Sequence, residues 1–254
     1  ERGNRMLLKG KNALVTGCNR GIGQAILQKF AEHGANVFAH ARTKNLEFEE
    51  NCKRLSNTYK VKIVPVYFDV TKDEEVKRGI KEIISQEKSI DILVNNVGAV
   101  NQVKLFQMTN IQEMREEFEI NFFAQMQITQ MISKIMIRRK QGSIINISSC
   151  AGLDGNTGML EYVSSKAAMI GATKRLAIEL GHYNIRVNSV APGLTDTQMG
   201  EKMSEKLQEE MFQKLVIKRK AMPQEIADAV VFFASDMSTF ITGQTLRVDG
   251  GMLN

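Results

Sequence analysis

Residues 15–23 of this chain read Val-Thr-Gly-Cys-Asn-Arg-Gly-Ile-Gly. They follow a short apolar run and open a helical pattern that ends at Gly34. Glycines in such a turn let the backbone approach phosphate groups, and the helix N-terminus adds free N–H groups and the positive end of its dipole. The segment therefore predicts a strand–turn–helix unit that binds the pyrophosphate of a dinucleotide, with a tight turn that holds no ligand as the alternative. The contacts expected here are Gly17, Asn19, Arg20, Gly21, Ile22 and Gly23.

Short apolar runs alternate with helical patterns outward from this turn. Most runs are hydrophobic throughout and rich in Val and Ile, as in strands buried on both faces of a parallel sheet. The alternation predicts one α/β domain over residues 1–254: a doubly wound (Rossmann) fold with a mostly parallel seven-stranded sheet and helices on both faces. The expected strands are Asn12–Thr16, Asn36–Ala41, Lys62–Phe68, Ile90–Asn95, Gly142–Ser148, Ile185–Ala191 and Gln244–Val248. The expected helices are Gly21–His33, Asp73–Gln86, Glu113–Arg139, Tyr162–Gly181 and Pro223–Ala234.

The composition is that of an ordinary globular protein, with 43% hydrophobic and 24% charged residues among 254. The longest apolar run, Ala229–Ala234, is far shorter than the roughly 18–20 residues of a membrane span. Residues 1–5 are polar and lack the apolar stretch of a secretory signal, so we expect no such signal here. Met6 is a candidate natural start. Three widely spaced cysteines, Cys18, Cys52 and Cys150, fit reduced thiols in the cytoplasm. We expect neither a membrane partner nor a metal site.

A formal charge of +6 is the one unusual feature of the composition. Such a charge fits a nucleic acid, an anionic membrane or an anionic small molecule as the partner. Nucleic-acid binding requires clustered basic residues with aromatic side chains among them. The basic runs 138–140 and 218–220 are short, and the chain has no Trp. We therefore expect no nucleic-acid partner and favour an anionic small molecule.

Several motifs follow the first turn in a fixed order. They are Asn95-Asn96-Val97-Gly98, Asn121, Ser149, Tyr162-x-x-x-Lys166, Pro192-Gly193 and Gly250-Gly251. With the Gly-x-x-x-Gly-x-Gly spacing of the turn, they resemble the short-chain dehydrogenase/reductase family from about Leu8 to Met252. Val97 departs from the alanine usual in that family. Within the family, the chain is most similar to the β-ketoacyl–acyl-carrier-protein reductases.

The end of the second expected strand indicates which nicotinamide cofactor binds. NAD-using enzymes place an acid about 20 residues beyond the glycine turn, whereas residues 37–43 read Val-Phe-Ala-His-Ala-Arg-Thr here. Arg20 and Arg42 can pair with a 2′-phosphate that a carboxylate would repel, and both resemble the family's NADP markers. The expected cofactor is NADP(H), and two solvated surface arginines are the alternative.

The resemblance implies further cofactor contacts. Asp69 and Val70 would meet the adenine, although an Asp after a strand is also a common cap or turn residue. Asn95 and Gly98 follow the fourth strand, where a plain turn is the alternative. A segment after the sixth strand would clamp the nicotinamide, although a Pro-Gly pair also marks ordinary turns. The residues of that segment are Pro192, Gly193, Thr195 and Thr197.

Tyr162 and Lys166 are the expected centre of the chemistry, because residues four apart share one helix face. Ketone reduction needs a proton donor, and a neighbouring ammonium lowers the pKa of tyrosine from its usual value near 10. Ser149 would donate to the substrate carbonyl, with Ser148 as the alternative donor. By resemblance, Lys166 also holds the cofactor ribose, and Asn121 interrupts its helix and links Lys166 to solvent through a water. A surface pair and a strand-end cap are the alternatives for these motifs.

The implied reaction is NADPH-dependent reduction of a ketone to a secondary alcohol. A 3-oxoacyl thioester is the expected substrate, with acyl carrier protein as a candidate partner. Related reductases dock that carrier through two arginines, and Lys140 and Tyr183 stand at the matching places. The alternatives are a free sugar, polyol or small cyclic ketone as substrate, or a dinucleotide-binding sensor or scaffold without turnover.

An amphipathic helix is expected within residues 200–222, where Met203, Leu207, Met211 and Leu215 recur every four residues. It is interpreted as a substrate lid, or else as a helix packed on the core or in a subunit contact. Asp154, Asn156, Met159 and Glu161 are candidates for lining the substrate site. By resemblance, the helices within 113–139 and 162–181 pair copies of the chain into a homotetramer or homodimer.

Overall fold

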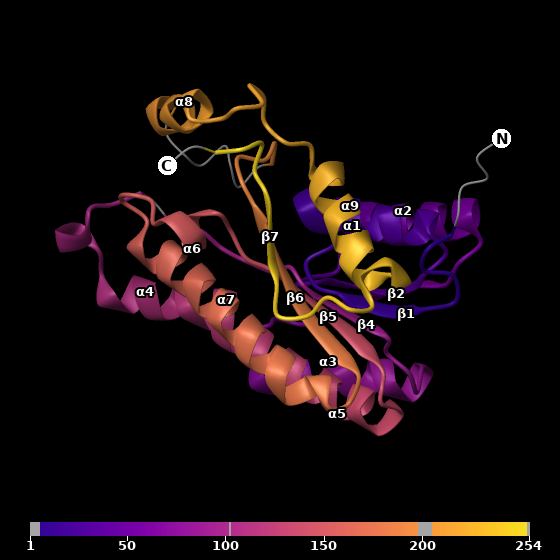
Figure 1. Cartoon of the computed structure of the whole chain (residues 1–254). Coiled ribbons are helices and arrows are strands. Elements are labelled where there is room, and N and C mark those ends of the chain that lie inside the picture. The colour runs from indigo at the N-terminus through magenta and orange to yellow at the C-terminus, as the bar shows by residue number, and fades with distance from the viewer. Residues whose placement is uncertain (1–5, 102, 198–204, 253–254) are drawn as a thin grey trace.

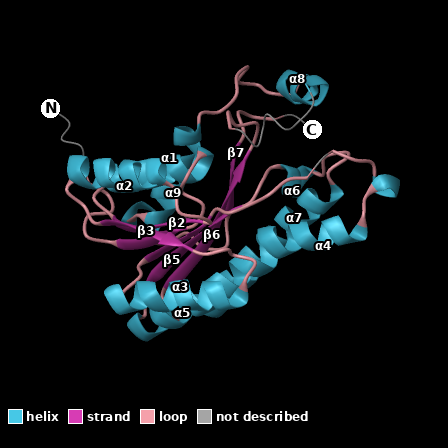
Figure 2. Ribbon diagram, turned by 180° about the vertical axis from the view of Figure 1, so that it is seen from behind, coloured by secondary structure: helices cyan, strands magenta, loops and turns pink. Residues whose placement is uncertain are grey.

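Within residues 6–101, 103–197 and 205–252, which the computed structural model describes, seven parallel strands form one sheet in the order β3-β2-β1-β4-β5-β6-β7. Helices cover both faces of the sheet (Figures 1 and 2). The prediction of a single Rossmann-like domain is confirmed. The strands are β1 (Asn12–Val15), β2 (Asn36–Ala41), β3 (Ile63–Tyr67), β4 (Ile92–Asn95), β5 (Gly142–Ile147), β6 (Ile185–Pro192) and β7 (Thr245–Val248).

The helices form two layers. In Figure 1, α1, α2 and α9 lie on one side of the sheet, and α3, α5 and α7 lie on the other. The bounds of the helices are α1 (Gly21–Glu32), α2 (Leu46–Tyr59), α3 (Asp73–Gln86), α4 (Ile111–Phe118), α5 (Ala124–Arg139), α6 (Ala151–Asp154), α7 (Leu160–Gly181), α8 (Glu205–Gln213) and α9 (Pro223–Ala234). Short helical turns are η1 (Phe106–Met108), η2 (Glu119–Phe123) and η4 (Asp236–Ser238).

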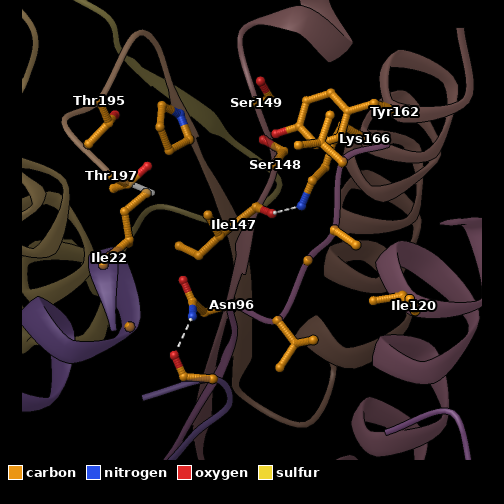
Figure 3. A pocket seen from close by; sticks show the side chains of 18 of the residues that line it. Ile22, Asn96, Ile120, Ile147, Ser148, Ser149, Tyr162, Lys166, Thr195 and Thr197 are labelled. Atoms are coloured by element: carbon orange, nitrogen blue, oxygen red, sulfur yellow. Dashed lines mark hydrogen bonds between the residues drawn. The ribbon is translucent and has the colours of Figure 1, made fainter. Parts of the chain in front are cut away.

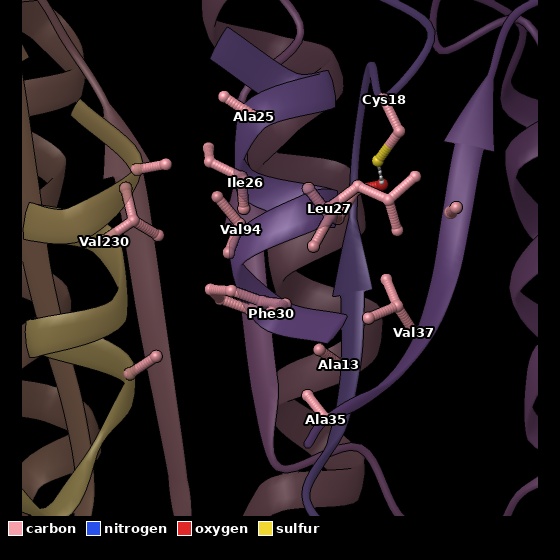
Figure 4. Packing of buried hydrophobic residues seen from close by; sticks show 14 of the residues in the cluster. Ala13, Cys18, Ala25, Ile26, Leu27, Phe30, Ala35, Val37, Val94 and Val230 are labelled. Carbon is pink, nitrogen blue, oxygen red and sulfur yellow. Dashed lines mark hydrogen bonds between the residues drawn. The ribbon is translucent and has the colours of Figure 1, made fainter. Parts of the chain in front are cut away.

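Burial on both faces explains why the strands are hydrophobic throughout. Consecutive strand residues point to opposite faces of a sheet. Leu14 of β1 packs with the layer of α3 and α5, whereas its neighbours Ala13 and Val15 pack with the layer of α1 and α9. Figure 4 shows Ile26, Leu27 and Phe30 of α1 in the cluster that contains Ala13, with Val230 of α9 beside them.

Helix α2 was not predicted from the sequence. Most of its 14 residues are polar, and only Phe48, Cys52 and Leu55 are buried. Asn45 begins the helix, because its side chain accepts a hydrogen bond from the Phe48 N–H at 3.3 Å. The apolar positions at i, i+4 and i+7 were the available signal.

The helix predicted over Glu113–Arg139 is interrupted. It consists of α4 and α5 with the π-helical turn η2 between them. Asn121 lies in this wider turn and is fully buried. The interruption implied by the resemblance is therefore present.

The order of the strands locates the binding crevice. The chain winds from β1 to β3 in one direction and from β4 to β7 in the other. Doubly wound sheets bind ligands outside the carboxyl ends of the strands at this switch point, which here lies between β1 and β4. Within the described ranges, no helix combines the length and apolarity that crossing a membrane requires.

Candidate active site

A cavity of about 690 Å³ lies at the carboxyl ends of the strands. Its walls come from the turn after β1, the ends of β2 to β6 and the start of α7, as Figure 3 shows in part. Almost all of the expected site residues border it. They are Gly17, Asn19, Arg20, Gly21, Ile22, Gly23, Arg42, Asp69, Val70, Gly98, Ser149, Tyr162, Lys166, Pro192, Gly193, Thr195 and Thr197.

The glycine-rich turn has the shape of a phosphate cradle. A side-chain carbon on Gly23 would overlap the carbonyl oxygen of Gly17, so only glycine lets α1 start this close to the turn. Gly21 has a φ of +56°, in the left-handed region that glycine tolerates. Arg20, at the N-cap, does not cap the first N–H groups of α1 with its side chain. These features fit the pyrophosphate of a dinucleotide at the helix N-terminus.

His40, which sequence reasoning did not single out, fixes this turn from β2. The Gly17 N–H donates to His40 Nδ1 at 3.2 Å, and His40 Nε2 lies 2.8 Å from the Phe68 carbonyl oxygen. Burial lowers the pKa of His40 to about 4, so the ring is neutral at pH 7. A neutral ring accepts at Nδ1 and donates from Nε2, which satisfies both contacts. The only sequence signal was a histidine within an apolar strand.

Two neighbouring asparagines at the end of β4 serve different sides of the sheet. Asn95 does not border the cavity: its Nδ2 donates to Thr129 Oγ1 at 2.7 Å and to Asn146 Oδ1 at 2.8 Å. Asn96 borders the cavity (Figure 3) and donates to the carbonyl oxygens of Thr16 at 2.9 Å and Gly17 at 3.2 Å. The sequence predicted Asn95 as a cofactor contact, whereas the asparagine that borders the cavity is Asn96.

Ser149, Tyr162 and Lys166 lie together on one wall of the cavity, and we refer to them as the Ser–Tyr–Lys cluster (Figure 3). The Ser149 hydroxyl lies close enough to the Tyr162 hydroxyl to lower its pKa. The ammonium nitrogen of Lys166 lies 5.8 Å from the centre of the Tyr162 ring and donates to the Ile147 carbonyl oxygen at 3.0 Å. The two motifs that the sequence separates by thirteen residues thus meet in space.

The structure favours Ser149 over Ser148 as the hydroxyl that faces the substrate. Ser148 donates to the Val190 carbonyl oxygen at 3.1 Å and accepts from Ser189 at 2.7 Å. These bonds tie Ser148 to β6. The Ser149 hydroxyl instead accepts from the Ala151 N–H at 3.2 Å and borders the cavity beside Tyr162.

The pKa values in the cluster differ from the sequence-based expectation. Burial raises the pKa of Tyr162, the Ser149 hydrogen bond opposes the rise, and the charge of Glu117 adds to it. The expected lowering by Lys166 is therefore not found. Burial lowers the pKa of Lys166 to about 8, and the charge of Glu117 opposes this change. In this arrangement the Lys166 amine donates to the backbone of β5.

Asn121 lies behind the cavity wall and not in it. Its Oδ1 accepts from the Ala99 N–H at 2.7 Å, and its Nδ2 donates to Ser165 Oγ at 3.0 Å. A side-chain carbon on Gly98 would lie 3.2 Å from Lys166 Nζ and 3.4 Å from Asn121 Oδ1. The Asn121 and Lys166 side chains therefore lie close to each other, with only the position of Gly98 between them.

The opposite end of the cavity carries positive charge. Arg20 and Arg42 border it and are exposed, and Ala41 at the end of β2 is buried. The carboxylate of Asp69 also borders this end and accepts from the N–H and hydroxyl of Thr71 at 3.0 and 2.8 Å. Burial acts to raise the pKa of Asp69, but the Thr71 bonds and the charge of Arg42 outweigh it and lower the value.

The expected substrate-lining residues divide into two groups. Asn156 and Met159 border the cavity, together with Met211 of α8. Asp154 instead forms an ion pair with Arg247 at 2.6 Å, and Glu161 is buried away from the cavity. Met203 and the rest of residues 198–204 lie outside the described residues.

The remaining reactive groups are buried or dispersed. Cys18, Cys52 and Cys150 are unpaired and buried, and burial raises the pKa of the Cys150 thiol. In the part of the chain that the structure describes, no group of three or more His, Cys, Asp or Glu side chains could hold a metal ion.

Known proteins resemble this chain over nearly its whole length. The profile of the family described as enoyl-(acyl carrier protein) reductase matches residues 17–253. The 3-oxoacyl-(acyl-carrier-protein) reductase FabG of Thermotoga maritima is 37% identical over 98% of this chain and 100% of its own length. A crystal structure of a 3-oxoacyl-(acyl-carrier protein) reductase from Brucella melitensis superposes with a TM-score of 0.90 at 32% identity, over 98% of this chain and 93% of that one.

A second crystal structure of such a reductase from Brucella melitensis has NAD bound. It superposes with a TM-score of 0.89 at 31% identity and covers 98% of this chain and 93% of that one. The profile, the sequence relative and the structural neighbours agree with the ordered motifs and with the fold. The chain belongs to the short-chain dehydrogenase/reductase family of oxidoreductases.

Proposed function

We propose that the protein reduces a ketone to a secondary alcohol with NADPH, and that the ketone is a 3-oxoacyl thioester. The observation that carries the proposal is the Ser–Tyr–Lys cluster on one wall of a cavity whose other end is the glycine-rich turn. A sensor or scaffold without turnover would have no need for a phenol, a hydroxyl and an amine held around one open space.

The residues divide the chemistry between them. When bound, the reduced nicotinamide supplies hydride to the carbonyl carbon. Ser149 donates a hydrogen bond to the carbonyl oxygen and stabilises the negative charge that develops there. Tyr162 gives its phenolic proton to the same oxygen. Lys166 holds the ribose hydroxyls and, with Asn121, returns a proton to Tyr162.

Positive charge at one end of the cavity supports NADPH over NADH. Arg20 and Arg42 border the position expected for the adenosine, and β2 ends in Ala41 without a carboxylate. Guanidinium groups bind phosphate through strong charge-assisted hydrogen bonds. Asp69 and Val70 border the same end and would meet the adenine, while Thr195 and Thr197 border the nicotinamide end.

The names of the relatives support a thioester substrate, because both the Thermotoga and Brucella proteins are named for 3-oxoacyl groups on acyl carrier protein. One observation favours a free ketone as the second candidate. Of the two positions expected to dock the acidic carrier, Lys140 keeps a positive charge, whereas Tyr183 is a half-exposed tyrosine. A free sugar, polyol or cyclic ketone needs no docking surface.

Two larger features belong to the same proposal. The segment 200–222 acts as a substrate lid, supported by Met211 of α8 at the cavity wall.

Copies of the chain pair into a homodimer or homotetramer through the helices of residues 113–139 and 162–181. Exposed apolar side chains on these helices, Phe123 and Ile178, support an interface there.

The test is NADPH oxidation, followed by absorbance, against acetoacetyl thioesters of coenzyme A and of acyl carrier protein and against a panel of free ketones. The proposal expects turnover with the thioesters and a higher kcat/KM than with any free ketone. A free ketone that is turned over best would replace the thioester as substrate. Absence of turnover with every ketone would favour the scaffold.

A further inference from the structure

Two acidic side chains, Glu117 and Glu161, are buried behind the Ser–Tyr–Lys cluster. Glu117 lies at the end of α4 with 1% of its surface exposed. Glu161 lies in the first turn of α7, directly before Tyr162, with 2% exposed. Burying a carboxylate is costly unless hydrogen bonds or opposite charges compensate it. The two side chains have no part in the proton path described above.

Glu117 reaches the cluster through Asn121. Its Oε2 accepts from the Asn101 N–H at 3.1 Å, and its Oε1 lies 3.4 Å from Asn121 Nδ2. The Asn121 side chain in turn lies beside Lys166, on the other side of Gly98. A negative charge on Glu117 is therefore held close to the amine and the phenol that carry the proton.

Glu161 is poorly compensated in its buried position. Its Oε2 has no hydrogen-bond partner within the described residues.

The pKa of Glu117 responds to the groups around it. Burial raises this pKa to about 7, and the charge of Glu161 adds to the rise. The Asn101 N–H and the charge of Lys166 oppose the rise. From α7, the titratable groups that act on Glu117 or respond to it are Glu161, Tyr162 and Lys166. From η2, the polar group that faces it is the Asn121 amide.

We propose that Glu117 is a positioning residue for the ketone reduction: its buried carboxylate keeps on Lys166 and Tyr162 the protons that the reaction consumes. This inference rests on the proposed function. An opposite charge favours the ammonium of Lys166, and a like charge disfavours the phenolate of Tyr162. Both effects hold the cluster in its protonated form to a higher pH than a neutral residue at position 117 would.

The test replaces the carboxylate with its neutral isostere, Glu117→Gln, which keeps an acceptor for the Asn101 N–H. Reduction requires protonated Tyr162, so kcat falls on the alkaline side of its pH profile. With saturating NADPH and acetoacetyl thioester, this fall is expected to move to lower pH by about one pH unit in Glu117→Gln. KM for the thioester is expected to change little. The matched control is Glu116→Gln, which removes the same charge from the exposed neighbouring position of α4.

A second readout needs no turnover. Because the folded pKa of Glu117 is about 7 and its ordinary value is 4.5, the folded state binds this proton more tightly. Its contribution to stability is complete below the ordinary value and is lost as the pH rises through the folded value. The unfolding temperature is therefore expected to fall less between pH 5 and 8 in Glu117→Gln than in the wild type. This scan also shows whether the variant folds, and Glu117→Asp, which keeps the charge, is expected to keep the wild-type kcat profile.

The outcomes separate this inference from the proposed function. Wild type that reduces the thioester, with an unchanged alkaline limb in folded Glu117→Gln, overturns the inference alone. An equal shift in Glu116→Gln overturns it as well, because surface charge would then explain the change. Wild type that reduces no ketone overturns the proposed function and the positioning role with it. A shifted limb together with the reduced pH dependence of unfolding supports the inference.

Discussion

Arg42 tests the choice of cofactor at the scale of a single residue. It borders the positively charged end of the cavity, and hydrogen bonds to charged groups contribute about 1.5–3 kcal/mol each. Arg42→Ala is expected to lower kcat/KM for NADPH roughly 10–100-fold and to change kcat/KM for NADH little. Lys44→Ala removes a nearby exposed charge outside the cavity wall and is expected to change neither value. Equal losses with both cofactors in Arg42→Ala would rule out a 2′-phosphate contact.

Neighbouring residues show where sequence reasoning succeeds and where it stops. Ser149, Tyr162 and Lys166 were predicted because their types and spacing match a family motif. Asn95 was predicted at the cavity because its motif lies there, yet consecutive strand residues point to opposite faces. The Asn95 side chain donates to Thr129 and Asn146, away from the cavity, whereas Asn96 borders the cavity. The roles of His40 and Glu117 depend on partners 23 and 16 residues away, Gly17 and Asn101, which no local pattern reveals.

At the scale of elements, the close contact between the glycine-rich turn and α1 leaves no room for a side chain at position 23. Gly23→Ala would force a carbon against the Gly17 carbonyl oxygen, and overpacking of this kind costs about 1–3 kcal/mol. The variant is expected to have a lower unfolding temperature and at least roughly tenfold weaker NADPH binding, because the N–H groups of the turn lose their alignment. Thermal unfolding and NADPH titration measure both effects.

The control for this change is Gly171→Ala in the middle of α7. A side-chain carbon there meets nothing within 4 Å, so alanine is expected to stabilise the helix by up to about 1 kcal/mol. Wild-type stability and NADPH affinity in Gly23→Ala would show that the turn tolerates a side chain and would remove the argument for a phosphate cradle.

The elements differ in how much of them the sequence reveals. All seven strands were predicted to within two residues at each end, because burial on both faces leaves unbroken apolar runs. Helix α2 was not predicted, because a surface helix buries few side chains and its apolar pattern is weak. The buried residues here are Phe48, Cys52 and Leu55. The π-helical turn at Asn121 was expected only from the family resemblance, because a single turn of five residues is too short to show a period of its own.

At the scale of the whole molecule, the charge of +6 has a partial explanation. Arg20 and Arg42 lie where the phosphate of NADPH is proposed to bind. Other basic side chains pair with acids, as Arg219 does with Glu225 and Arg247 with Asp154. Lys140 caps the end of α5 and keeps its place as a candidate contact for an acidic carrier.

The proposed assembly makes a prediction about mass. Light scattering in solution is expected to give two or four times the 28.5 kDa of one chain. Ile178 is 65% exposed on α7, and placing a charge in an apolar interface is unfavourable. Ile178→Glu is therefore expected to shift the population toward smaller species without lowering the unfolding temperature of the single chain. A wild-type mass of 28.5 kDa at micromolar concentration would contradict the assembly.

The most direct test of the account is the kinetics of Tyr162→Phe beside wild type, with NADPH and acetoacetyl thioester as substrates. Removing the proton donor while keeping the ring is expected to lower kcat by about 10²–10⁴-fold, with NADPH affinity nearly unchanged by titration. Near-wild-type kcat in this variant would contradict the proposed role of Tyr162 and with it the proposed mechanism.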